Sequence, residues 1–292
     1  MTTEHDLQSE ADAIQWFHSI DLGNGVVTKG LTELALRSDQ LPEFEGRSVL
    51  DIGAWDGYYS FHAERAGASR VVALDHYAWG VDFVARGAYW NECISKGVLP
   101  DHGRDETDFW HDDLPGRRGF EFAHKAIGSK VEPVLDDFMK IDLDGLGTFD
   151  VVLYLGVLYH IKEPLTAMER LRAVTGEVAV IETEAVHLHG FDNESAMQFH
   201  ADSSVGVDFG NWYVPTIGAI KGLARAAGFS RVEVFVGPPA PPAPEPASTP
   251  APLTFLERVG RRLAPAPPPT PTPAPPTSAP TQNYRAVVHA YV

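Results

Sequence analysis

A glycine-bearing loop followed by an acidic strand end is the part of this sequence best suited to chemistry. An apolar run, Val49–Ile52, leads into Gly53 and Gly57, and a second apolar run, Val71–Leu74, ends on Asp75. A helical pattern separates the two runs, so the segment predicts a β-loop-α-β unit. Such a loop lets a ligand approach the backbone, and a carboxylate after the second strand suits two ribose hydroxyls. Nicotinamide dinucleotides and S-adenosylmethionine both carry such a ribose, so two cofactors are open at this point.

The spacing of the glycines favours one of these cofactors. A dinucleotide loop has the pattern G-x-G-x-x-G, whose middle glycine lets the backbone touch the pyrophosphate. Here three residues separate Gly53 from Gly57, and Trp55 stands between them. The indole leaves little room for a diphosphate, whereas S-adenosylmethionine contains no phosphate. We expect Asp51 and the loop backbone to hold its amino-acid moiety, and Asp75 to accept both ribose hydroxyls.

A second candidate region lies in the stretch 149–160, where a strand and a glycine turn precede Tyr159 and His160. This pair is expected where a methyl group would be presented. An imidazole has an ordinary pKa of about 6.5, so His160 is the candidate base for a hydroxyl acceptor. Glu182 and Glu184, at the end of the next strand, could orient the imidazole or activate the acceptor. The alternatives are that His160 packs on Tyr159 or caps a carbonyl, and that Glu182 is structural.

At these residues the chain resembles class I S-adenosylmethionine-dependent methyltransferases. Within that class it is similar to the group around the tRNA wobble-uridine carboxymethyltransferase. The resemblance covers residues 47–236 and the final strand, and it rests on the glycine loop and on the stretches 156–165, 181–183 and 211–216. It implies a doubly wound, mostly parallel Rossmann-like α/β sheet with an antiparallel last strand. It also implies S-adenosylmethionine as the cofactor.

The resemblance places Tyr159 and His160 opposite the transferred methyl group, and Glu182 is the third catalytic candidate. The adenine is expected against the three residues that follow the third strand. No metal is assigned, because the histidines and acids at positions 62, 76, 187, 189, 200, 202 and 208 show no zinc-ligand spacing. The predicted cofactor-binding residues are Asp51, Gly53, Ala54, Trp55, Gly57, Asp75, His76, Asp136, Asp137, Phe138, Leu155 and Gly156.

Three features separate this chain from the wobble-uridine group. That enzyme uses a carboxylated S-adenosylmethionine, and only Arg285 stands here where a basic side chain would meet the extra charge. An unpaired buried carboxylate is costly, so we expect ordinary S-adenosylmethionine. The region before Arg47 is also shorter than in that enzyme. Finally, 23 Lys and Arg against 40 Asp and Glu give a net charge of −17, which disfavours a nucleic acid.

The expected activity is therefore O-methylation of a small molecule, such as a sugar or a secondary metabolite. Methylation or carboxymethylation of the tRNA wobble uridine is the first alternative. A non-catalytic cofactor-binding scaffold that recruits partners through a proline-rich tract is the second. That tract, residues 238–282, is rich in Pro and Ala and is expected to be a flexible insertion.

The elements that position these residues follow from the hydrophobic pattern. Strands and helices alternate, which predicts a mostly parallel sheet. Residues 1–46 form a predicted cap, and residues 47–237 with 283–292 form the predicted core. Strands are expected at 48–53, 70–75, 131–134, 149–154, 177–183, 230–236 and 284–292, and helices at 11–17, 31–37, 57–66, 163–173 and 215–227.

Residues 77–130 interrupt this alternation with a long excursion that is rich in Trp, His and Asp. Helical pieces are expected near 81–96 and 117–127. A stretch of this length inside an α/β domain predicts a lid or substrate wall, with a surface insertion as the alternative.

Composition bounds the setting of the chain. A single cysteine, Cys93, cannot form an internal disulfide, which fits a reducing cytoplasm. The first ten residues are acidic and polar, unlike a secretory signal. No apolar run reaches the roughly 18 residues that a membrane span needs. We therefore expect a cytoplasmic protein with no membrane segment.

Overall fold

The computed structural model describes residues 4–32, 36–104, 107–188, 191, 194–202, 205, 208–239 and 281–292. Its centre is a set of strands with apolar residues on both faces. β3 (Ser48–Ile52) pairs parallel with β4 (Arg70–Asp75) and with β6 (Phe149–Leu155). β5 (Glu132–Leu135) adds to β4, and β7 (Thr175–Leu188) adds to β6, both in parallel. Near-continuous apolar runs are typical of parallel strands that are covered on both sides.

Two antiparallel pairings complete the seven-stranded sheet, whose order is β10-β11-β7-β6-β3-β4-β5. The last strand, β11 (Thr281–Tyr291), runs antiparallel between β7 and β10 (Arg231–Val236). The predicted fold class, a mostly parallel α/β sheet with an antiparallel last strand, is therefore confirmed. All seven predicted strands of this sheet are present, and β7 extends further in both directions than the sequence indicated.

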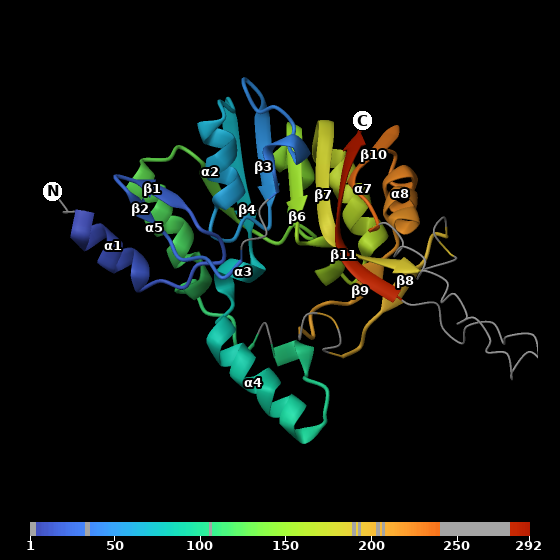
Figure 1. Cartoon of the computed structure of the whole chain (residues 1–292), viewed down its shortest axis with the longest axis horizontal. Helices are drawn as coiled ribbons and strands as arrows, with labels where there is room; N and C mark the ends of the chain where they lie inside the picture. The colour runs from blue at the N-terminus through green and yellow to red at the C-terminus, as the bar shows by residue number, and fades with distance from the viewer. Residues whose placement is uncertain are drawn as a thin grey trace, which may run out of the picture.

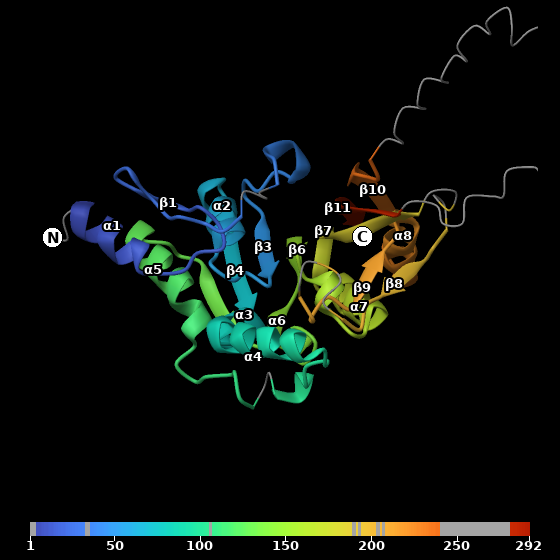
Figure 2. The ribbon, with the colours of Figure 1, turned by 60° about the horizontal axis from the view of Figure 1, so that its bottom comes forward.

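Helices cover both faces of this sheet, as Figures 1 and 2 show. α2 (Tyr58–Arg65) and α5 (Arg118–Ile127) pack in one hydrophobic cluster, and α7 (Pro164–Val174) and α8 (Ile217–Ala226) pack in the other. Successive strand residues point to opposite faces, so each central strand contributes to both clusters. This arrangement makes the sheet doubly wound, as expected.

The N-terminal segment differs from the prediction. Its helix, α1 (Glu4–Asp12), ends well before the predicted 11–17 segment does, and Trp16 beyond it forms a β-bridge with Gly30. The buried side chains after α1 occur at Trp16, Ile20 and Leu22, an even-numbered pattern that suits extended chain. The helix predicted near 31–37 is also absent from the described residues of that range, which are 31, 32, 36 and 37. A single 3₁₀ turn, Ser38–Gln40, follows the range.

Several short elements were not predicted. They are α3 (Tyr77–Gly80), α6 (Leu143–Leu146) and two small antiparallel pairs, β1 (Asp21–Gly23) with β2 (Val26–Val27) and β8 (Met197–Phe199) with β9 (Tyr213–Pro215).

The 77–130 excursion divides into two parts. α4 (Phe83–Lys96) extends away from the sheet, near the carboxyl ends of the central strands (Figure 1). Asp82 caps it by accepting the N–H groups of Val84 and Ala85, and Gly97 ends it with a φ of 65°. α5, by contrast, packs on the sheet beside α2. The part in position to form a substrate wall is therefore α4 and the residues directly around it.

In the part of the chain that the structure describes, no helix combines the length and apolarity needed to cross a bilayer. The predicted 238–282 insertion falls almost wholly outside the described residues, as does its Leu253–Leu263 segment.

Candidate functional site

The predicted cofactor loop lies at the carboxyl end of β3. Gly53 has a φ of 77°, and a Cβ at this position would lie 2.7 Å from Cγ2 of Val157. Gly57, at the start of α2, has a φ of 83° and lies equally close to the ring of Phe61. Both positions combine a left-handed backbone with close approach, so both favour glycine. The Gly53 backbone is exposed, which leaves it accessible to a ligand.

Two buried carboxyl groups flank this loop. Asp51 accepts a hydrogen bond from Oγ of Ser60 at 2.6 Å. Asp75 accepts the N–H groups of Trp55 and Ala78, each at 2.9 Å. Burial raises the pKa of each carboxyl group to about 6. A carboxylate oxygen can accept more than one hydrogen bond, so Asp75 retains acceptor capacity for ribose hydroxyls.

Trp55 is held in an aromatic stack. Its ring lies 4.2 Å from that of Phe17, at 16° between planes, and 5.2 Å from that of Phe83. Asp56 accepts the N–H groups of Phe17 and His18, and its other oxygen lies 2.8 Å from Nδ1 of His18. The N-terminal segment is thus bound to the glycine loop. Trp16, the residue before Phe17, is buried in the core.

The residues predicted to contact the adenine, Asp136, Asp137 and Phe138, have different environments. Asp136 is half-buried, and its N–H donates to the Asp75 carbonyl. Asp137 accepts the N–H of Met139 at 2.9 Å, which ties it to the local turn. The ring of Phe138 is buried in the cluster under α7, so that ring is committed to the core.

His76 and Leu135 lie near the residues predicted to contact the adenine. His76 stacks on Trp110 with 4.3 Å between ring centroids. Leu135, which pairs with Asp75 across β5 and β4, is 41 % exposed. Leu135 was not among the predicted residues, although its place directly before Asp136 could have indicated it. Its exposed apolar surface suits the face of an adenine.

The turn after β6 brings the catalytic candidates together. Gly156 has a φ of 72°, and its N–H donates to the Glu182 carbonyl at 2.9 Å. A Cβ on Gly156 would lie 3.7 Å from the Tyr159 hydroxyl. The rings of Tyr159 and His160 have centroids 4.1 Å apart. Leu155, Gly156, Tyr159 and His160 therefore lie together at the turn after β6, and their roles in catalysis and cofactor binding stay predictions.

A main-chain carbonyl orients the His160 imidazole. Nδ1 lies 3.0 Å from the carbonyl oxygen of Gly210. A carbonyl only accepts, so Nδ1 carries the proton and Nε2 carries the lone pair. Burial among neighbouring atoms lowers the pKa of His160, Asp208 acts in the opposite direction, and the charges of Arg86 and Arg285 lower it further. The lowered pKa favours the neutral imidazole.

Glu182 has a different partner from the one expected. The Arg285 guanidinium donates to both of its carboxylate oxygens, and Nη1 donates to Glu184 at 3.1 Å. The same guanidinium lies over the Tyr159 ring, 5.1 Å from its centroid. Glu182 and Glu184 thus neutralise Arg285, and the described contacts of the imidazole are with Gly210 and Tyr159 instead. Gly210 and Asp208 were missed as positioning residues because neither belongs to a motif that we examined for catalysis.

No group of three or more His, Cys, Asp or Glu in the described residues could hold a metal ion. His189 lies outside those residues.

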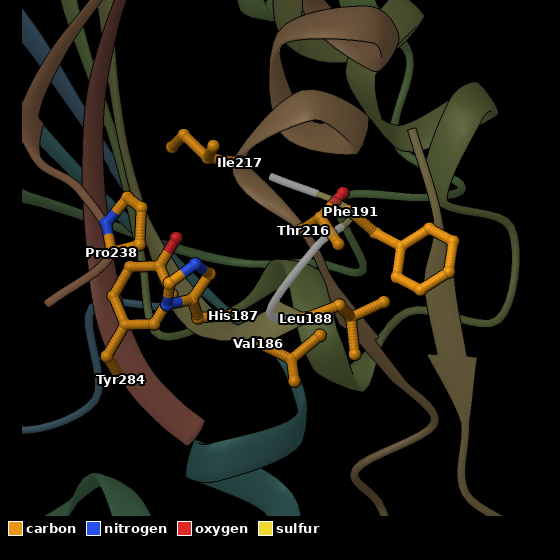
Figure 3. A pocket seen from close by; sticks show the side chains of 8 residues that line it. All are labelled: Val186, His187, Leu188, Phe191, Thr216, Ile217, Pro238 and Tyr284. Atoms are coloured by element: carbon orange, nitrogen blue, oxygen red, sulfur yellow. The ribbon is translucent and has the colours of Figure 1, made fainter. Parts of the chain in front are cut away.

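A separate hollow lies beyond this site, where β7 ends and α8 and β11 begin (Figure 3). It encloses about 180 Å³, including open solvent. Its lining shares no residue with the predicted cofactor site and consists of Val186, His187, Leu188, Phe191, Thr216, Ile217, Pro238 and Tyr284.

The doubly wound sheet, the glycine loop and the two strand-end carboxylates define a nucleoside-binding α/β protein of the methyltransferase type. A family model described as a methyltransferase domain matches residues 26–234. The chain therefore belongs to this methyltransferase family, which confirms the predicted class, an S-adenosylmethionine-dependent methyltransferase, and its cofactor.

Curated relatives include proteins named tRNA U34 carboxymethyltransferase. The one from Pseudomonas putida (strain W619) is 26% identical over 193 residues, covering 65% of this chain and 48% of its own length. The one from Pseudomonas putida (strain GB-1) is 29% identical over 191 residues, covering 64% and 47%. The chain thus spans about half the length of the curated relatives that it matches.

Solved structures show the same fold. The N-terminal domain of EvdMO1 with SAH bound has a TM-score of 0.56 at 17% identity, covering 81% of this chain and 91% of that one. The same domain in the presence of SAH and D-fucose has a TM-score of 0.56 at 15% identity, covering 100% and 97%.

Proposed function

We propose that this methyltransferase transfers a methyl group from S-adenosylmethionine to a hydroxyl group of a small molecule, such as a sugar or a secondary metabolite. The observation that carries the proposal is the His160 imidazole, which the Gly210 carbonyl orients through Nδ1 and whose lowered pKa favours the neutral form with a lone pair on Nε2. A hydroxyl acceptor loses a proton during transfer, and such a base accepts it.

The residues present fit the cofactor. Asp75 has spare acceptor capacity for the ribose, Gly53 offers an exposed backbone, and Leu135 offers apolar surface. When bound, S-adenosylmethionine supplies an electrophilic methyl group for in-line displacement. The protein then has to align the acceptor hydroxyl, exclude water and take up the proton at Nε2 of His160.

The state of Arg285 supports the unmodified cofactor over the carboxylated one. Its guanidinium already bonds Glu182 and Glu184, so a cofactor carboxylate would have to displace a protein carboxylate. The net charge of −17 also opposes a polyanionic acceptor. A sugar was present in one crystal of the EvdMO1 domain, which is a reason to begin the acceptor search with sugars.

Calorimetry and a transfer assay test the proposal. The purified chain is titrated with S-adenosylhomocysteine, with carboxylated S-adenosylmethionine and with NADH, and only the first is expected to bind tightly. Release of S-adenosylhomocysteine is then followed with sugar and secondary-metabolite hydroxyls and with tRNA. Preference for the carboxylated cofactor and turnover on tRNA would establish the wobble-uridine alternative instead.

The scaffold alternative predicts a different result. A non-catalytic protein would bind S-adenosylhomocysteine but transfer no methyl group to any acceptor. Deletion of residues 240–280 would then abolish partner capture without changing cofactor affinity. Turnover that survives this deletion contradicts the scaffold.

A further inference from the structure

An arginine on α4 is buried among aromatic rings. Arg86 is 6% exposed, and its guanidinium carbon lies 4.1 Å from the Trp90 ring centroid, 4.8 Å from that of Phe83 and 5.1 Å from that of Tyr77. One terminal nitrogen donates to the Tyr77 hydroxyl. The rings fix the plane of the guanidinium.

Among the residues that the structure describes, Arg86 forms no ion pair with an Asp or Glu, and its buried Nε has no hydrogen-bond partner. Cation–π contacts attract the guanidinium but do not neutralise it. A buried charge without a counter-charge is costly, so an anion beside Arg86 would stabilise it.

The same arginine adjoins the candidate base. A Cβ built on Gly210 would lie 3.1 Å from Oδ1 of Asp208, 3.6 Å from Nδ1 of His160 and 4.0 Å from Cη2 of Trp90. Trp90 therefore contacts Arg86 and also lies next to Gly210, whose carbonyl orients His160. The Asp208 carboxylate in this cluster accepts the Gly210 N–H at 2.7 Å. The Arg86 charge is felt at the imidazole, where it lowers the pKa of His160.

We propose that Arg86 binds an oxyanion, a carboxylate or a phosphate, on the methyl acceptor, so that the acceptor is a small anionic molecule. This inference rests on the proposed function, because it assigns the anion to the molecule that His160 deprotonates. A planar guanidinium bonds such an oxyanion through two parallel N–H groups. In Arg86 one terminal nitrogen donates to Tyr77. Nε, which has no partner, and the other terminal nitrogen would supply the two parallel N–H groups.

A second arginine in the same excursion provides a matched control. Arg104 lies 4.2 Å above the Tyr89 ring centroid and 5.5 Å from that of Phe109. It is also stacked on aromatic rings, but its Nε donates to Asp108 at 2.6 Å. Its charge is already balanced, so Arg104→Met removes a stacked arginine without removing an anion site.

The test uses inorganic phosphate and acetate as probes of the full chain. Calorimetry and the His160 ring signals in NMR are recorded for wild type, Arg86→Met, Arg86→Lys and Arg104→Met. Wild type and Arg104→Met are expected to bind one of the probes, and which probe binds distinguishes a phosphate from a carboxylate. Arg86→Met should lose about tenfold or more in affinity, as expected when a charge-assisted hydrogen bond is removed. Arg86→Lys keeps the positive charge but loses the two parallel N–H groups of the guanidinium, so it should retain part of the affinity for the probe.

S-adenosylhomocysteine affinity, measured in parallel, separates the two proposals. It should be the same in all four proteins, which also shows that the variants are folded. If wild type does not bind S-adenosylhomocysteine, the proposed function is contradicted, whether or not phosphate or acetate binds. Failure of wild type to bind either probe, or equal binding by wild type and Arg86→Met, would overturn the role of Arg86.

Discussion

Nδ1 of His160 lies 3.0 Å from the carbonyl oxygen of Gly210, fifty residues away in the sequence. This bond selects one tautomer and leaves Nε2 as the proton acceptor. The carbonyl lies in the segment that also holds Asp208, whose charge favours the protonated imidazole. The candidate base is thus oriented by the backbone, and the Asp208 carboxylate favours its protonated form.

Removal of the imidazole tests this assignment directly. His160→Ala should lower turnover by roughly 10²–10⁴-fold, because proton removal by a positioned base contributes that much. Affinity for S-adenosylhomocysteine should stay the same, since the proposed function assigns the imidazole to the acceptor rather than to the ribose. Single-turnover rates and calorimetry measure the two quantities. Turnover equal to wild type would exclude His160 from the reaction.

The pH profile gives a second test of the same residue. His160 must be neutral to act, and burial lowers its pKa below the ordinary 6.5. Turnover should therefore fall as pH drops, with its midpoint below 6.5. Because the Arg86 charge helps to lower this pKa, Arg86→Met should move the midpoint upward. A midpoint that is identical in Arg86→Met and wild type would contradict the electrostatic link.

Asp51 gives a prediction on stability. Its pKa is about 6 in the folded protein because of burial, against 3.8 ordinarily. The folded state therefore binds more protons than the unfolded state between these values, and stability is lost as pH rises from about 4 to about 6. The effect is at most about 3 kcal/mol.

Comparison with Asp51→Asn isolates this effect from other titrating groups. The variant keeps an oxygen for Ser60 Oγ but does not ionise. The difference in free energy of unfolding, Asp51→Asn minus wild type, should increase between pH 4 and pH 6, because wild type loses stability over this range. Urea denaturation at each pH measures this difference. A constant difference across this range would show that Asp51 titrates as it does in the unfolded chain.

The glycine loop can be tested by separating backbone strain from collision. Gly53→Ala combines a φ of 77° with a Cβ only 2.7 Å from Val157. Gly97→Ala is the matched control, because it has a φ of 65° and nothing within 4 Å of the added Cβ. The control should lose about 1–2 kcal/mol from backbone strain alone.

Gly53→Ala should lose more stability than this control and should bind S-adenosylhomocysteine more weakly. Val157→Ala in the same chain should recover part of the excess, because it removes the collision but not the strain. Thermal unfolding and calorimetry on the single and double variants measure both effects. No recovery in the double variant would indicate that the Val157 contact is irrelevant.

Cofactor choice should depend on the acids around Arg285. In Glu182→Gln/Glu184→Gln the guanidinium loses both carboxylates and becomes available to an external one. Affinity for carboxylated S-adenosylmethionine should then rise relative to the unmodified cofactor, by tenfold or more if one charge-assisted hydrogen bond forms. Competition calorimetry measures the ratio, and an unchanged ratio would show that Arg285 lies out of reach of the transferred group.

The sequence predicted the sheet well because its central strands are continuous apolar runs, such as Val71–Leu74, which only a two-sided core accommodates. It predicted the cofactor loop for a related reason, since a left-handed backbone restricts Gly53 and Gly57 to glycine. Helix positions before β3 were less accurate. There, tertiary contacts such as the Trp16 bridge to Gly30 overrode local preference.

The site partners were harder to predict because they join distant parts of the chain. Nothing in the motif around His160 indicates Gly210, and nothing near Glu182 indicates that Arg285 would neutralise it. Arg86 was overlooked because a basic residue on an amphipathic helix ordinarily faces solvent. Its burial depends on Tyr77, Phe83 and Trp90 closing around it.

The aromatic stack on Trp55 has a consequence for the order of ligand binding. The Trp55 ring joins Phe17 in the N-terminal segment to Phe83 at the start of α4, and the Trp55 backbone N–H donates to Asp75. A ligand that displaced this indole would disturb Phe83, in the helix that carries Arg86. Coupling of cofactor and acceptor binding through this stack would be reciprocal, so that each ligand would change the affinity for the other by the same factor.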